Sequence, residues 1–218
     1  AEVWHALLNI HVVMRSKGLV EESLEPLARA EEVASSLGED SAHVFFENAR
    51  GQLLMVKHDF SAAIEHFRTA ITLAGDARAA VTVRLNLAEA LLAAGRPLEA
   101  TQEARAAERE AIVARFPNKL PEVYRLLGCV AAREGHPDSF VLFERALEIV
   151  EERVLPPLER AITLQAYSAA ERRVGDLETS ARLQELADQI YQELGIDNHR
   201  SQWGDHCGSH EDRNATKD

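Results

Sequence analysis

Apolar and polar positions follow a helical period along most of this chain. Leu24, Leu27 and Ala28 lie three and four residues apart before the pattern returns to polar residues, and Ile64 and Phe67 repeat the spacing. No segment shows the sustained alternation of apolar and polar residues that is typical of a half-buried strand. The pattern therefore predicts an all-α chain.

Short turns interrupt these helical stretches at nearly equal intervals. Gly18, His58, Gly95, Gly135 and Gly175 mark the turns, and successive markers are 40, 37, 40 and 40 residues apart. Glycine tolerates the positive φ angle that commonly ends a helix, so we expect His58 to end its helix by another route. Regular breaks of this kind indicate an internal repeat.

The repeat predicts five pairs of helices followed by a polar tail. Residues 1–195 form the predicted helical domain, whereas residues 196–218 lack apolar periodicity and are expected to form a flexible tail. Pro156 and Pro157 predict an extended stretch before the last pair. The predicted helices span residues 2–16, 20–37, 42–57, 61–74, 78–94, 97–115, 120–134, 138–153, 158–174 and 177–194.

Composition and charge narrow the function classes. Hydrophobic residues make up 46% of the chain and aromatic residues only 6%, which suits helices packed through Ala and Leu. The formal net charge of −12 argues against a general nucleic-acid-binding surface, which needs a cationic face. No apolar run is long enough for a membrane span and no signal peptide is visible, so we expect a cytoplasmic protein. The chain opens at Ala1 inside a helical pattern, and we expect it to be part of a longer protein.

The second predicted pair resembles a tetratricopeptide repeat. Gly51 lies halfway along its first helix, and Ala63, Phe67 and Ala70 occupy the small–aromatic–small positions of its second helix. Matching positions in the third and fourth pairs are Ala88, Leu91, Ala100, Ala104, Ala107, Gly128, Phe143 and Ala146. The resemblance covers residues 1–195, although the period is near 40 rather than the usual 34 or so. Longer repeats of this kind resemble those in bacterial transcription regulators and signalling proteins.

This resemblance implies a right-handed α-solenoid of about five antiparallel helical hairpins, with armadillo- or HEAT-like arrays as the structural alternative. It also implies a concave groove in which the inward face of each first helix meets a protein or peptide. Carried over residue by residue, the groove positions are Phe45, Asn48, Gln52, Met55, Leu85, Asn86, Glu89, Leu92, Glu122, Arg125, Cys129, Arg133, Gln165, Arg172 and Arg173. The first half of this set is apolar with amides and the second half is basic, so a partner with an apolar stretch and an acidic segment would fit.

Signatures of chemistry are missing from the sequence. It contains no G-x-S-x-G, Walker, H-E-x-x-H or dinucleotide-binding motif, so we predict no catalytic residues, no cofactor and no enzymatic activity. The tail residues His199, His206, Cys207 and His210 are of types that bind zinc, but their spacing matches no common structural site and we predict no metal.

The function that follows is a protein- or peptide-binding scaffold that binds neither nucleic acid nor membrane directly. The alternative is a ligand- or peptide-sensing regulatory domain of a bacterial transcription regulator or signalling protein. Self-association through the N-terminal helix is a further expectation, because that helix carries a large apolar set. Its members are Trp4, Leu7, Leu8, Ile10 and Val12.

Overall fold

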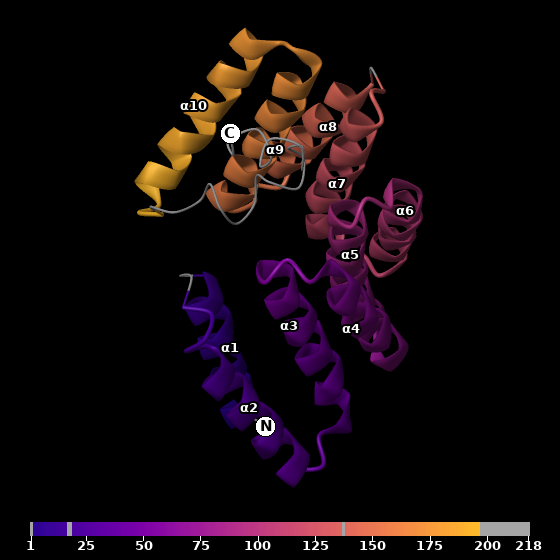
Figure 1. The fold of residues 1–218 in the computed structure, drawn as a ribbon, viewed down its shortest axis with the longest axis vertical. Helices are drawn as coiled ribbons and strands as arrows, with labels where there is room; N and C mark the ends of the chain where they lie inside the picture. The colour runs from indigo at the N-terminus through magenta and orange to yellow at the C-terminus, as the bar shows by residue number, and fades with distance from the viewer. Residues whose placement is uncertain (1, 17–18, 137, 197–218) are drawn as a thin grey trace, which may run out of the picture.

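The structure is a computed structural model that describes residues 2–16, 19–136 and 138–196. All regular structure in these ranges is helical and none of it is strand, which confirms the all-α prediction (Figure 1). Two short 3₁₀ helices, at Asp40–Ala42 and Pro117–Lys119, precede α3 and α7. The α-helices are α1 (Glu2–Ser16), α2 (Leu24–Ser36), α3 (His43–Val56), α4 (Phe60–Leu73), α5 (Ala77–Ala93), α6 (Pro97–Val113), α7 (Leu120–Arg133), α8 (Ser139–Glu152), α9 (Pro157–Val174) and α10 (Leu177–Glu193).

The start of α2 differs from the prediction. The helix begins at Leu24 rather than at residue 20, because Ser23 closes a turn in front of it. The Ser23 backbone N–H donates to the carbonyl of Leu19 at 3.1 Å, and its hydroxyl donates to the carbonyl of Val20 at 2.7 Å. Hydrogen bonds of a serine side chain to nearby backbone compete with helix formation.

The turns within the pairs show how each first helix ends. Gly95, Gly135 and Gly175 adopt positive φ angles of 74°, 73° and 91°, as expected for helix-ending glycines. The expectation that His58 uses another route was wrong, because His58 itself adopts a φ of 58°. This conformation is costly for a residue with a Cβ. Asp59 then caps α4, accepting a hydrogen bond from the Ala62 N–H at 3.1 Å.

Close approach within two pairs depends on glycine. A Cβ at Gly51 of α3 would lie 2.5 Å from Cε1 of Phe67 in α4, and a Cβ at Gly128 of α7 would lie 2.9 Å from Cζ of Phe143 in α8. Both phenylalanines are 0% exposed. The ring of the second helix therefore fills the space that a side chain on the first helix would occupy, as the repeat pattern predicts.

Neighbouring pairs pack on one another in chain order. The second helix of one pair contacts the first helix of the next, as α4 contacts α5, α6 contacts α7 and α8 contacts α9. First helices also contact one another, α3 with α5, α5 with α7 and α7 with α9. Figure 1 shows the helices following a curve, with α3 toward its inner side and α4 and α6 toward its outer side. The face of the first helices on this side is called the inner face below.

Candidate binding site

On the inner face, a hydrogen bond between two side-chain amides links α3 to α5. The Asn86 side-chain N–H donates to Oδ1 of Asn48 at 2.7 Å. Both side chains are half-buried, as are Gln52 on α3 and Glu89 on α5. The carboxylate of Glu89 acts electrostatically on Arg15 in the last turn of α1, although burial is the larger influence and lowers the pKa of that arginine. Polar groups from three first helices therefore gather on this face.

The fifteen predicted groove residues differ in how much of each side chain is exposed. Phe45, Arg172 and Arg173 are exposed. Half-buried are Asn48, Gln52, Met55, Asn86, Glu89, Glu122, Arg125 and Arg133. Buried are Leu85, Leu92, Cys129 and Gln165. The exposed and half-buried residues are accessible to solvent, and the buried ones are not.

The buried residues correct part of the predicted set. Leu85 and Leu92 are 0% and 1% exposed, because α5 is enclosed by α3, α4, α6 and α7. A helix at the protein surface has one face toward solvent, whereas these two positions of α5 face neighbouring helices. Cys129 is 4% exposed within the apolar core. Gln165 is 5% exposed, and its Oε1 accepts a hydrogen bond from the Tyr191 hydroxyl at 2.9 Å. These four residues support the fold and are not contacts for a partner.

The predicted basic half of the inner face is partly neutralised. Arg125 has only 12% of its side chain exposed and pairs with Glu159 of α9 at 3.4 Å. Glu122 is paired with Lys119 at 2.7 Å. Arg133 forms no ion pair within the described part of the chain, and neither does Arg172. The cationic character of the inner face is therefore concentrated at the C-terminal ends of α7 and α9.

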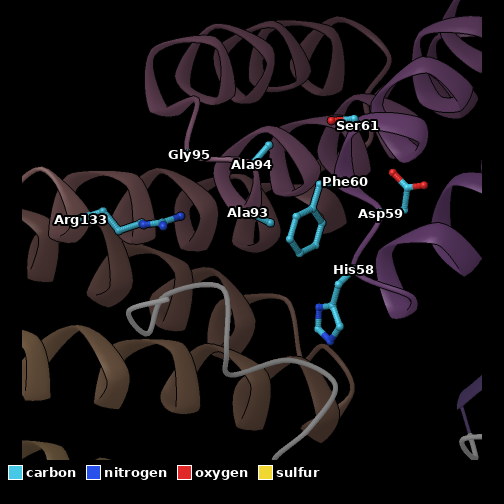
Figure 2. A pocket seen from close by; sticks show the side chains of 8 residues that line it. All are labelled: His58, Asp59, Phe60, Ser61, Ala93, Ala94, Gly95 and Arg133. Atoms are coloured by element: carbon cyan, nitrogen blue, oxygen red, sulfur yellow. The ribbon is translucent and has the colours of Figure 1, made fainter. Parts of the chain in front are cut away.

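A pocket of about 550 Å³ lies beside these ends, where the turns of two neighbouring pairs meet α7. Figure 2 shows the Phe60 ring and the Arg133 side chain pointing into the same space, with Ala93 between them. We call this the turn pocket. It is lined by His58, Asp59, Phe60, Ser61, Ala93, Ala94, Gly95 and Arg133.

The turn pocket combines an apolar wall with one cation. The rings of His58 and Phe60 meet edge to face, with centroids 5.8 Å apart. Arg133 donates one hydrogen bond from Nη1 to the carbonyl of Leu92 at the end of α5. Burial, and secondarily the positive charge of Arg173, lower the pKa of the Arg133 guanidinium. Of these residues, the sequence analysis assigned only Arg133 to a site.

The N-terminal helix presents apolar side chains to solvent, although not the whole predicted set. Trp4 is 3% exposed and packs on Phe46 of α3 with ring centroids 5.9 Å apart. Leu7 and Leu8 are half-buried against the same cluster. Ile10 and Val12 are 44% and 41% exposed. Self-association through this helix remains a prediction, now limited to its exposed residues.

Neither a metal-binding group of side chains nor a membrane-spanning helix occurs among the residues with described positions. No group of three His, Cys, Asp or Glu side chains there is arranged to hold a metal ion. The predicted absence of a metal site at His199, His206, Cys207 and His210 concerns residues outside the described part of the chain. Within that part, no helix combines the length and apolarity needed to cross a bilayer.

No protein-family model matches the chain, and no curated protein matches it.

Proposed function

We propose that this chain is a protein- or peptide-binding scaffold built as a right-handed tetratricopeptide-like solenoid, with its concave groove along the inner face. The observation that carries the proposal is the polar surface that the first helices share. Asn48 and Asn86 link α3 to α5 at 2.7 Å, with Gln52 beside Asn48 on α3. Amides that are half-buried in a concave surface can hydrogen-bond to a peptide backbone or side chain without a large desolvation cost.

The two ends of the inner face differ in chemistry, which supports a partner with two kinds of segment. Phe45, 41% exposed, offers an apolar contact near the start of α3. Arg172 and Arg173 expose positive charge in the last turn of α9. A peptide with an apolar part and an acidic part would be oriented by this difference. A cytoplasmic location belongs to the same proposal.

Selection from a displayed library of random peptides on the purified chain, followed by calorimetric titration with the synthetic peptides obtained, tests the proposal. Gln52→Ala and Arg172→Ala should each weaken binding about tenfold, since interface truncations that matter cost 1–2 kcal/mol or so. Gln102 and Arg109, which are exposed on α6 at the outer side, provide matched controls. Gln102→Ala and Arg109→Ala should leave the affinity unchanged.

The proposal fails if the selected peptides bind the Gln52 and Arg172 variants as tightly as the wild-type chain. It also fails if affinity falls only in the α6 controls, because the binding surface would then lie on the outer helices. Circular dichroism of each variant must match that of the wild type, so that a lost fold is not read as a lost contact.

A further inference from the structure

The turn pocket brings together residues from three pairs that are far apart in sequence. His58, Asp59, Phe60 and Ser61 come from the α3–α4 turn, Ala93 to Gly95 from the α5–α6 turn, and Arg133 from the end of α7. The repeat places these turns along one edge of the array, so the pocket follows from the stacking of pairs. It has a volume of about 550 Å³ and is largely open to solvent.

Arg133 supplies a positive charge whose hydrogen-bonding capacity is largely unused. Of its five N–H donors, one is engaged by the Leu92 carbonyl, and no other hydrogen bond or ion pair of this side chain occurs within the described ranges. Several arginines of the described chain pair with a glutamate, as Arg96 does with Glu99 at 2.6 Å. Arg133 instead has another cation, Arg173, as its charged neighbour. A carboxylate supplied from outside would relieve this repulsion.

The opposite wall of the turn pocket is apolar. The Phe60 ring is half-buried, and Ala93 is 6% exposed, so the wall between them is made of carbon. In Figure 2 the ring faces the same space as the Arg133 side chain. A ligand that meets both walls needs an apolar group and an anionic group within one short span.

The nearby carboxylate of Asp59 and the carbonyl at the end of α5 do not cancel this preference. Asp59 lines the pocket, but its Oδ1 is engaged as the cap of α4, and Figure 2 shows Asp59 and Arg133 on opposite sides of Phe60. The Leu92 carbonyl at the end of α5 already accepts a hydrogen bond from the Arg133 guanidinium. The chain's net charge of −12 acts mainly at long range, and salt screens charges more than about 10 Å apart.

We propose that the turn pocket holds an acidic side chain and the apolar residue next to it in a peptide partner, with Arg133 binding the carboxylate and Phe60 and Ala93 contacting the apolar group. The identity of the ligand as a peptide segment rests on the proposed function. The pocket itself can be tested without any partner. It adds to the inner face an anchoring site at the turn edge of the array, in which Arg133 is the residue that the family resemblance also places in the groove.

The probe is 3-phenylpropionate, which carries one carboxylate and one aromatic ring. Titration into the isotopically labelled chain, followed by amide NMR, should shift the Ser61, Ala94 and Gly95 signals with millimolar affinity, the range open to so small a ligand. The neutral amide, 3-phenylpropanamide, should bind about tenfold more weakly, because it lacks a charge-assisted hydrogen bond. Arg133→Gln should abolish this difference, whereas Arg109→Gln, with the same change in net charge, should preserve it.

Three results would overturn the proposal. One is an absence of shifts at the turn-pocket amides, and another is equal affinity for the acid and its amide. The third is tighter binding of phenyl phosphate than of 3-phenylpropionate, which would assign the pocket to a phosphorylated ligand. Selected peptides that depend on Gln52 but are indifferent to Arg133→Gln would refute the turn pocket alone, and the proposed scaffold function would stand.

Discussion

The approach of α3 to α4 at Gly51 gives a prediction whose sign is decided by two opposing effects. Gly51→Ala removes a glycine from a helix interior, which by intrinsic propensity stabilises the helix by about 0.5–1 kcal/mol. The new Cβ would lie 2.5, 2.7 and 2.8 Å from three carbons of the Phe67 ring. Favourable carbon–carbon contacts occur near 3.5–4.0 Å, so the ring must move by about 1 Å.

The ring has little room to move. Phe67 is 0% exposed and belongs to the main apolar cluster together with Ile64 and Leu91. Overpacking in such a core costs about 1–3 kcal/mol, which exceeds the propensity gain. We therefore expect Gly51→Ala to lower the free energy of unfolding by about 1–2 kcal/mol.

Substitutions at two further glycines should destabilise the chain less than Gly51→Ala. At Gly128 the nearest ring carbons of Phe143 would lie 2.9, 3.0 and 3.1 Å from the new Cβ, so Gly128→Ala should destabilise by less than Gly51→Ala. At Gly75 no atom lies within 4 Å of the Cβ position, and Gly75→Ala should change stability by at most about 0.5 kcal/mol. The order of the three variants follows from the distances alone.

Urea unfolding followed by circular dichroism measures the three differences. Because repeat arrays can unfold in parts, hydrogen exchange at the amides of α3 and α4 should accompany the titration. In the Phe67→Leu background the smaller side chain should reduce the cost of Gly51→Ala by about 1 kcal/mol. The reasoning is refuted if Gly51→Ala is neutral or stabilising, or if it costs less than Gly128→Ala.

Three other predictions concern single sites. Val154 has a φ of 50° and is 89% exposed, so Val154→Asn should stabilise the chain by about 1 kcal/mol in urea unfolding. Val113 is 83% exposed at a helical position, and Val113→Asn should therefore give no gain in stability. Burial lowers the pKa of His11 below its ordinary 6.5, so the neutral form is favoured in the folded chain. The midpoint of urea unfolding should therefore fall as the pH drops below about 6.5, and His11→Gln should flatten this pH dependence. Tyr191→Phe removes the 2.9 Å hydrogen bond to buried Gln165, and we expect a loss of about 1–2 kcal/mol by thermal unfolding, with an unchanged helical signal.

Local interactions explain why the helices could be predicted so closely. The apolar period and the turn residues of each pair act within a few residues of each other, so the pattern of Ile64, Phe67 and Ala70 marks α4 without any knowledge of its neighbours. Gly51 and Gly128 were recognisable as positions of close approach through the resemblance to tetratricopeptide repeats. The start of α2 was mispredicted, because the hydrogen bond of the Ser23 side chain to the backbone delays the helix. The backbone of His58 was mispredicted, because a residue other than glycine adopts the left-handed conformation there.

Which side chains reach solvent was decided by packing among helices distant in the chain. Leu85 and Leu92 occupy plausible inner-face positions in sequence, yet both are buried because α5 is covered on several sides. The turn pocket likewise needs two turns and the end of α7 to be stacked before Arg133, Phe60 and Ala93 face one space.

The sequence by itself determined the helices and their pairing, since both depend on periodicity and turns within about forty residues. Only the tertiary structure decided which polar groups remain available to a partner, because burial and charge pairing depend on every helix packed around them.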